Sequence, residues 1–373
     1  MARLTYHGSC SNLDYIAFSK PQIDHVDNGA FRRARNITWC DTIGYGMSKL
    51  SEMGEKEAVR RILAEIAEKE SSNALGPGDD AAAVDMGFIY LVATTDLISQ
   101  STHVLPGMTD WQIGWTVAAV NFSDVAAMGA KPIGLLVSMG LPKEMPSESL
   151  DEIIRGILDC CECAGGEMLG GDTKESPELS LSGTALGTVA KKEILLRKGA
   201  KINDLLAVTG SLGLAAAGYY SIKNSLGEKR AEKALLEPKP RVKEGMALSA
   251  SGVVTSCMDI SDGLASSIYT LGEASKVSFE VNYIAIPVEK EVIAVARKVD
   301  VSPEELVLYY GGDYQLLFTL KPEGLSLLSS LLGNSFTVIG KARAASESIL
   351  TKDSKTIPLE NRGYEHFRQG KTA

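Results

Sequence analysis

Six short segments of this 373-residue chain end in aspartate and are otherwise built mainly of small residues. A carboxylate in such company can share a hard cation while the backbone stays close enough to touch a polyphosphate. One Gly-Asp pair is also an ordinary turn, but six such segments, several inside apolar stretches, favour a Mg²⁺-dependent phosphoryl-transfer site. The segments are Gly78-Asp79-Asp80, Thr94-Thr95-Asp96, Asn121-Phe122-Ser123-Asp124, Gly170-Gly171-Asp172, Asp259-Ile260-Ser261-Asp262 and Gly311-Gly312-Asp313.

Asp124 is the most informative of these acids. On a helix predicted from the capping box at Thr109, it continues the apolar face of Ile113, Val117 and Val120. A carboxylate on a buried stripe is costly unless it is paired or binds a metal. No basic residue lies on that helix, so a metal-binding role is favoured over the alternative of a capping or solvated aspartate.

Two further acids flank a predicted strand at 88–93. Asp80 precedes the strand and Asp96 follows it, while Thr94 and Thr95 can add hydroxyl or carbonyl oxygens. Because Mg²⁺ accepts few protein ligands besides phosphate and water oxygens, so many carboxylates imply more than one ion.

The segments at Asp172 and Asp259 are expected at strand ends. Gly171 would let the backbone touch a nucleotide after a short strand at 167–169, and Asp172 would hold the metal of that nucleotide. Asp259 to Asp262 would connect a strand at 253–258 to a helix at 264–274, so Ser261 and the helix N-terminus can donate to phosphate. Asp259 and Asp262 would then face the same ions.

The periodicity between these segments predicts alternating strands and helices, an α+β fold. We expect a first half from 47 to 195, which holds metal and ATP, and a second α+β half from 196 to 345. Residues 1–46 are predicted to be an extension, poorly ordered or upstream of the true start, and 346–373 a peripheral tail. Predicted elements include helices at 55–69, 109–129, 149–165, 213–222 and 242–250, and strands at 132–139, 178–189, 205–209, 277–281 and 336–339.

Composition restricts the class of partner. The net charge is −9 and the pI about 5.2, which argues against nucleic acid or an anionic membrane. No apolar run reaches the length of a membrane span and no secretory signal is evident, so a cytoplasmic protein is expected. The cluster Cys160-Cys161-Glu162-Cys163 has no second pair at zinc spacing, which favours reduced packing cysteines.

The order and wording of the motifs resemble thiamine-monophosphate kinase, from about Met47 to about Lys341. The matching segments are Gly78-Asp-Asp-Ala-Ala82, Thr94-Thr-Asp96, His103-Val-Leu-Pro106, Ala119 to Ala130, Gly170-Gly-Asp-Thr173, Asp259-Ile-Ser-Asp-Gly-Leu264 and Gly312-Asp-Tyr314. The resemblance implies the two-domain fold of aminoimidazole-ribonucleotide synthetase, whose N-terminal halves pair into a dimeric barrel, and hence a homodimer. It also implies ATP-dependent phosphorylation of thiamine monophosphate to thiamine diphosphate on several Mg²⁺ ions.

The resemblance also assigns roles to single residues. It favours Asp80 over Asp79 as the metal ligand, and it places Arg197 on the nucleotide and His103 on the substrate. The bacterial pattern has a substrate-binding Glu where this chain has Gly312, and Asp313 is the neighbour that could replace it.

Two alternatives stay open at this stage. The first is another ATP-dependent member of the superfamily, similar to aminoimidazole-ribonucleotide synthetase or selenophosphate synthetase. The second is a non-catalytic nucleotide-binding regulator, against which the full set of carboxylates argues.

Overall fold

The computed structural model describes residues 50–67, 74–75 and 78–367; the predicted extension 1–46 lies outside them. The first half forms a six-stranded sheet in the order β1-β2-β3-β6-β4-β5, with all neighbours antiparallel except β4 and β5. Its elements are α1 (Leu50–Met53), α2 (Glu55–Ala67), β1 (Ala74–Leu75), β2 (Ala82–Asp85), β3 (Ile89–Ser99), α3 (Gln100–His103), α4 (Asp110–Ala127), β4 (Lys131–Leu141), α5 (Ser147–Ala164), β5 (Glu167–Glu175) and β6 (Ser180–Ala190).

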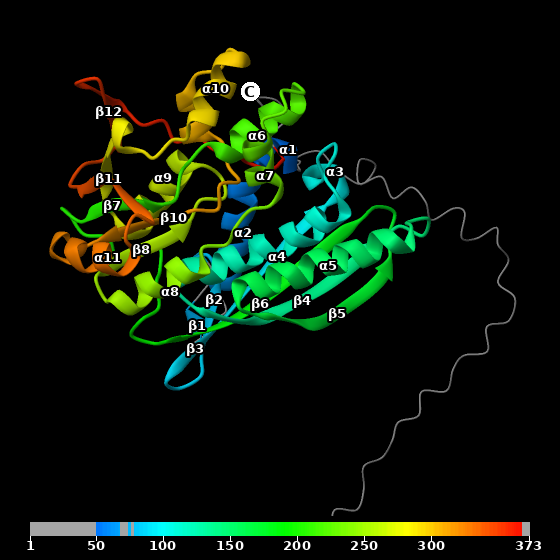
Figure 1. The fold of residues 1–373 in the computed structure, drawn as a ribbon. Helices are drawn as coiled ribbons and strands as arrows, with labels where there is room; N and C mark the ends of the chain where they lie inside the picture. The colour runs from blue at the N-terminus through cyan, green and yellow to red at the C-terminus, as the bar shows by residue number, and fades with distance from the viewer. Residues whose placement is uncertain (1–49, 68–73, 76–77, 368–373) are drawn as a thin grey trace, which may run out of the picture. The chain divides into compact units, whose positions relative to one another are not determined.

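Helices α4 and α5 lie side by side over one face of this sheet (Figure 1). Their backbones touch because glycine stands at the crossing: a Cβ on Gly114 would lie 1.9 Å from the carbonyl oxygen of Ile153. The capping box predicted at Thr109 is confirmed, since its side chain accepts from the backbone N–H of Gln112. Helix α5 starts at Ser147 without a side-chain cap, so the start predicted at Ser149 is wrong.

The second half contains a seven-stranded sheet in the order β13-β12-β9-β11-β7-β10-β8. Strands β7 and β8 both pair with β10. Both are important for the site, because β8 ends at Asp259 and β7 leads into α6. The elements are β7 (Leu205–Thr209), α6 (Leu214–Lys223), α7 (Lys229–Leu236), α8 (Val242–Ser251), β8 (Val254–Asp259), α9 (Leu264–Ser275), β9 (Ser278–Asn282), η2 (Tyr283–Ala285), α10 (Lys290–Lys298), η3 (Glu305–Tyr309), β10 (Leu316–Leu320), η4 (Pro322–Gly324), α11 (Leu325–Leu332), β11 (Phe336–Arg343), β12 (Ile349–Lys352) and β13 (Lys355–Pro358).

The two halves share one apolar core where they meet. Buried residues of α4 belong to the same cluster as Leu248 of α8 and Phe318 of β10. Asp259, at the end of β8 in the second half, is therefore held against α4 of the first half. The division predicted near residue 195 falls in the segment between β6 and β7.

Two sequence-based expectations are wrong. Residues 349–358 form β12 and β13, and β12 pairs with β9, so this part of the predicted tail belongs to the second sheet. Gly170, Gly171 and Asp172 do not follow a short strand but lie inside β5. The strand continues because Gly171 passes so close to β4 that a Cβ there would lie 1.8 Å from the carbonyl oxygen of Val137.

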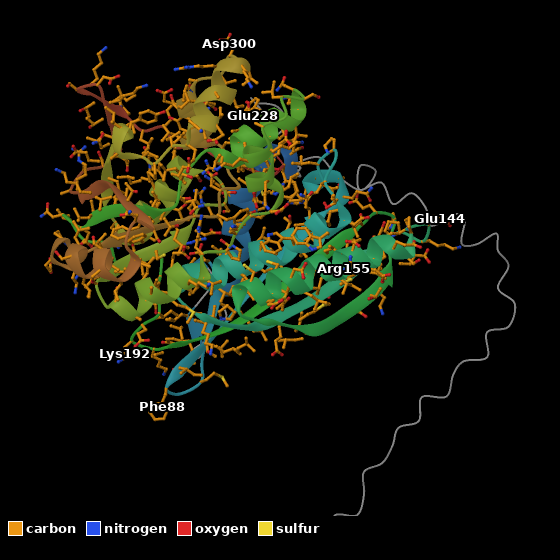
Figure 2. All side chains as sticks on the ribbon, viewed as in Figure 1. Phe88, Glu144, Arg155, Lys192, Glu228 and Asp300 are labelled. Atoms are coloured by element: carbon orange, nitrogen blue, oxygen red, sulfur yellow. The ribbon has the colours of Figure 1, made fainter. Side chains whose placement is uncertain are left out.

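The face of the first sheet opposite α4 and α5 carries exposed apolar side chains. Leu97, Ile133 and Leu136 alternate along β3 and β4 with buried neighbours. At the turn between β2 and β3, Phe88 is 95% exposed and points away from the fold (Figure 2). None of the described helices is long and apolar enough to cross a membrane.

Candidate metal and phosphate site

Three carboxylates from distant parts of the chain converge where the two halves meet. One oxygen from each of Asp80, Asp124 and Asp259 lies within 4.8 Å of the others. Asp80 follows a glycine turn, Asp124 lies in the last turns of α4, and Asp259 ends β8. Both halves therefore contribute to one acidic centre, as the motif series predicts for these three residues.

The negative charges of these three carboxylates repel one another. Burial raises the pKa of the Asp124 carboxyl well above its ordinary range, and nearby carboxylates raise it further, Asp259 foremost. Burial and the charge of Asp80 raise the pKa of Asp259 to about 8. Such crowding is stabilised when a cation binds between the carboxylates.

One oxygen of this centre lacks a protein partner. The side chain of Asp80 is fully buried; its Oδ1 accepts from Nη2 of Arg197 at 2.8 Å. Its Oδ2 is buried with no hydrogen-bond partner among the described residues. A buried oxygen without a donor is costly unless it binds a ligand, so the donor set fits a hard cation such as Mg²⁺.

Two hydroxyl groups orient the other carboxylates. The Oγ1 of Thr94 donates to Asp124 Oδ2 at 2.6 Å. The Oγ of Ser123, on α4, donates to Asp259 Oδ2 at 2.6 Å and so links the two halves directly. Each bond lowers the pKa of the carboxyl that accepts it, which partly offsets the repulsion.

Asp96 and Asp262 lie beside this centre, and their carboxyl groups also have raised pKa values. Burial raises the pKa of Asp96, and the charge of Glu55 on α2 raises it further. The same two causes raise the pKa of Asp262 to about 6. Glu55 thus brings a further carboxylate close to two predicted ligands. Ser261 stands one residue before Asp262, and its carbonyl accepts from the N–H of Gly312 at 2.8 Å.

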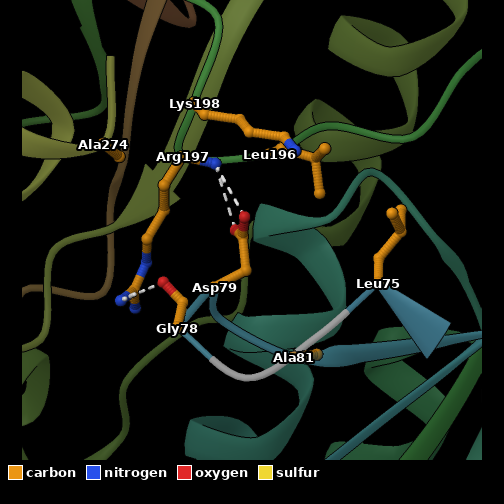
Figure 3. A pocket seen from close by; sticks show the side chains of 8 residues that line it. All are labelled: Leu75, Gly78, Asp79, Ala81, Leu196, Arg197, Lys198 and Ala274. Atoms are coloured by element: carbon orange, nitrogen blue, oxygen red, sulfur yellow. Dashed lines mark hydrogen bonds between the residues drawn. The ribbon is translucent and has the colours of Figure 1, made fainter. Parts of the chain in front are cut away.

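Arg197 lies beside the acidic centre, and Figure 3 shows it next to Asp79 and Gly78. Its backbone N–H donates to both oxygens of Asp79, at 3.0 and 3.2 Å, while its guanidinium reaches Asp80. Beside it a pocket of about 280 Å³ is lined by Leu75, Gly78, Asp79, Ala81, Leu196, Arg197, Lys198 and Ala274. Arg197 therefore lies between the carboxylates and a cavity that carries a second cationic side chain, Lys198.

Thr95 and Asp172 are not brought to the acidic centre. Adjacent strand residues point to opposite faces, so Thr95 lies on the open face, where its hydroxyl donates to the carbonyl of Gly183 at 2.7 Å. Asp172 pairs with Ser138 across β5 and β4, is largely exposed and forms an ion pair with Lys174 at 3.3 Å. Their roles as ligands, and that of Gly171 on ATP, stay predictions.

His103, at the end of α3, lies beside the C-terminal segment. Its Nδ1 accepts from the backbone N–H of Ser99 at 3.2 Å, which leaves Nε2 to carry the proton of the neutral ring. Burial lowers the pKa of His103, and the nearby His366 lowers it further. The two rings are 5.6 Å apart.

Asp313 is placed as a helix cap. Its two carboxylate oxygens accept from the backbone N–H groups of Gly213, at 2.7 Å, and Ala215, at 3.1 Å, at the start of α6. Gly312 has a φ of +89°, a left-handed conformation that glycine adopts easily. The predicted substrate contact of Asp313 stays a prediction, beside a structural role that the geometry already explains.

Sequence reasoning missed the residues that support the acids. Ser123 and Asn121 are in the predicted motif, but only the structure shows that Asn121 Oδ1 accepts from the backbone N–H of Asp96 at 3.0 Å. Glu55 and His366 carried no local signal, because they meet each other across 311 positions of the chain, and His366 reaches His103 from the far end of the sequence.

Comparison with protein families shows the general class of protein to which the chain belongs. Residues 78–189 match the family described as AIR synthase related protein, N-terminal domain, and residues 201–353 match its C-terminal domain. The chain is thus a two-domain AIR synthase related protein with mixed α and β content.

Individual relatives show to which family of these two-domain proteins the chain belongs. The chain is 37% identical to a thiamine-monophosphate kinase of Methanospirillum hungatei, over 77% of this chain and 92% of the relative. It is 32% identical to the Pyrococcus horikoshii enzyme of that name, over 86% and 98% of the two chains. A solved structure, AaThiL complexed with AMPPCP and TMP, superposes with a TM-score of 0.76 at 27% identity, covering 86% of this chain and 99% of the other. The chain belongs to the thiamine-monophosphate kinase family.

Proposed function

We propose that this protein transfers the terminal phosphate of ATP to thiamine monophosphate and so makes thiamine diphosphate. The observation that carries the proposal is the convergence of Asp80, Asp124 and Asp259 within 4.8 Å in a chain of this kinase family. The complex of a related protein with AMPPCP and TMP supports both substrates.

The acidic centre is proposed to hold Mg²⁺. Asp80, Asp124 and Asp259 would provide ligands. Asp96 lies close enough to raise the pKa of Asp124, and Asp262 shares with Asp96 the influence of Glu55. Bound Mg²⁺ neutralises phosphate charge and orients the transferred group. The chain itself contributes the fixed placement of these oxygens through Thr94 and Ser123.

ATP is proposed to lie along Arg197. The guanidinium, already beside Asp80, can pair with phosphate oxygens, and Arg is suited to this by its planar fork of donors. Lys198, in the adjoining pocket, adds positive charge next to it. Together with the acidic centre, these residues would position the phosphates for a direct, in-line transfer.

The acceptor is proposed to bind on the side of His103. Its Nε2–H can donate a hydrogen bond to the acceptor phosphate, because Nδ1 is held by the N–H of Ser99. A phosphate oxygen is already ionised near neutral pH, so no residue has to remove a proton from it. Free thiamine offers an alcohol instead, for which this site provides no assigned base.

A homodimer is proposed on the open face of the first sheet. Leu97, Ile133, Leu136 and Leu169 are exposed there or at its edge, and exposed apolar side chains gathered on one sheet face favour a protein contact. Pairing of two such sheets would form the barrel that the family resemblance implies, and would cover Thr95 and Asp172.

Product analysis by phosphorus NMR tests the proposed function. With Mg²⁺-ATP and thiamine monophosphate, we expect thiamine diphosphate and ADP in equal amounts, and no product from free thiamine. Turnover of a different acceptor in place of thiamine monophosphate would assign the chain another activity of the superfamily.

A further inference from the structure

The segment from Leu359 to His366 crosses the second domain and ends at the candidate site. Leu359 is buried; its N–H donates to the carbonyl of Ser348 at 2.9 Å, and its own carbonyl accepts from Tyr269 Oη at 2.5 Å. From this anchored start the chain leaves β13 and runs to the loop at Asp262.

Arg362 fixes the middle of this segment. Its Nη1 and Nη2 donate to the two carboxylate oxygens of Glu305 at 3.0 and 2.9 Å, and its Nε donates to Glu360 at 2.8 Å. The guanidinium also lies 3.9 Å from the ring centroid of Tyr309. Glu305 and Tyr309 are the two ends of η3, a single π-helical turn. The ion pair is bidentate and the guanidinium stacks on an aromatic ring. A surface ion pair with this geometry contributes more to stability than surface ion pairs usually do.

Three of the next four residues contact the site. Gly363 packs on the loop of Asp262 so closely that a Cβ would lie 2.5 Å from the Asp262 carbonyl oxygen. That same carbonyl accepts from the N–H of Tyr364 at 3.0 Å. The N–H of His366 donates to Glu55 Oε2 at 3.0 Å, and its ring contacts His103.

We propose that Arg362 is a positioning residue for the acceptor side of the site. Held by Glu305 and Tyr309, it sets where residues 363–366 lie relative to His103 and the Asp262 loop. In the contacts described above, Arg362 touches neither the side chain of His103 nor that of Asp262, so it acts through residues 363–366. The inference rests on the proposed function, in which His103 faces thiamine monophosphate.

The alternative is that Arg362 only stabilises the second domain. That role would change the unfolding temperature but affect both substrates alike. If Arg362 positions the acceptor side, its loss should change the KM for thiamine monophosphate but not the KM for ATP. The reason is that Arg197 and the pocket beside it lie on other segments of the chain.

Steady-state kinetics of the full chain with Mg²⁺-ATP separate the two roles. For Arg362→Ala we expect the KM for thiamine monophosphate to rise about tenfold, with the KM for ATP within about twofold of the wild type. Arg362→Lys should restore only part of the loss, because an ammonium group cannot form the bidentate pair. Glu305→Gln should resemble Arg362→Lys.

Arg230→Ala is the matched control. Arg230 also bridges two carboxylates, Glu289 at 3.0 Å and Glu291 at 3.3 Å, and is similarly exposed, but it joins α7 to the segment around α10. Its removal should leave both KM values unchanged. Equal changes in the two KM values of Arg362→Ala, or no change in either, would overturn the proposal.

Hydrogen exchange of the substrate-free protein separates failure of this proposal from failure of the proposed function. The amides of Tyr364 and His366 should exchange faster in Arg362→Ala than in the wild type, and at the wild-type rate in Arg230→Ala. Unchanged exchange in Arg362→Ala overturns the anchoring role. A wild-type protein that transfers no phosphate to thiamine monophosphate overturns the proposed function and the acceptor named here, whatever the exchange rates.

Discussion

At two places in this molecule, the charge of an aspartate is satisfied in opposite ways. At the acidic centre, Asp124 and Asp259 each receive one short hydroxyl bond but face several other carboxylates. At the start of α6, Asp313 receives backbone N–H bonds on both oxygens, and these lower its pKa against the raising effect of burial.

The difference shows how a buried acid can be classified from its surroundings. A carboxylate whose oxygens are filled by a helix N-terminus completes the fold and needs nothing more. A carboxylate surrounded by like charges and beside a buried oxygen without a donor requires a cation. Substitutions should therefore have opposite consequences at the two places.

The largest effect is expected for Asp124→Asn. Loss of this charge should reduce turnover by about 100-fold or more and weaken binding of Mg²⁺-ATP, because a proposed ligand is removed. The metal-free protein should unfold at the same or a higher temperature, since repulsion is relieved. Calorimetric titration and thermal unfolding measure the two results, with Asp85→Asn at the end of β2 as control. Wild-type turnover in Asp124→Asn would remove the metal assignment.

Asp313→Ala should give the reverse pattern. The free energy of unfolding should fall by about 1–3 kcal/mol, because backbone donors at the start of α6 lose their acceptor. Affinity for Mg²⁺-ATP should be unchanged. Denaturant unfolding and titration together check this expectation. An unchanged stability with a raised KM for thiamine monophosphate would instead support the substrate contact that the sequence predicts for Asp313.

The pH dependence should distinguish the metal-free from the metal-bound protein. Asp259 has a folded pKa of about 8, above its ordinary value of 3.8, so the folded state holds this proton more tightly. Its contribution to stability is full below about pH 4 and is lost as the pH rises through 8. Mg²⁺ should therefore raise the unfolding temperature more at pH 8.5 than at pH 6, by a few degrees. An equal increase at both pH values would contradict the crowded centre.

Thr94→Val should have the smallest effect of this series. It removes the 2.6 Å bond to Asp124 without removing a charge, so the affinity for Mg²⁺-ATP should fall only about threefold to tenfold. Thr94→Ser keeps a hydroxyl and should stay close to the wild type. Isothermal titration of both variants makes the comparison, and an equal loss in the two would show that the methyl group matters rather than the bond.

Much of the first half could be predicted from local pattern. The capping box at Thr109 predicts α4, and the apolar period along α4 places Asp124 on the inward face of the helix, where it is partly buried. Strand alternation alone would also have separated Thr94 from Thr95, since neighbouring side chains point to opposite faces. The motif types predict that Asp259 lies with Asp124, but the bond from Ser123 to Asp259 depends on how the two domains pack.

Other parts depend on contacts that leave no local pattern. The pairing of Arg362 with Glu305 joins residues 57 positions apart, and Tyr364 meets Asp262 across about 100 residues. Gly170 and Gly171 suggest a turn by composition, yet they allow two strands to approach closely. In each case packing between distant segments outweighs local propensity.

The bond between Ser123 and Asp259 has a consequence for how this protein could evolve. Each domain supplies only part of the acidic centre, because Asp80 and Asp124 come from one and Asp259 from the other. Division of the gene within the segment between β6 and β7 would leave two products that have no complete site apart. Duplication of either domain alone would likewise create a copy without the whole acidic centre. Selection on catalysis therefore acts on the two domains as a single inherited unit.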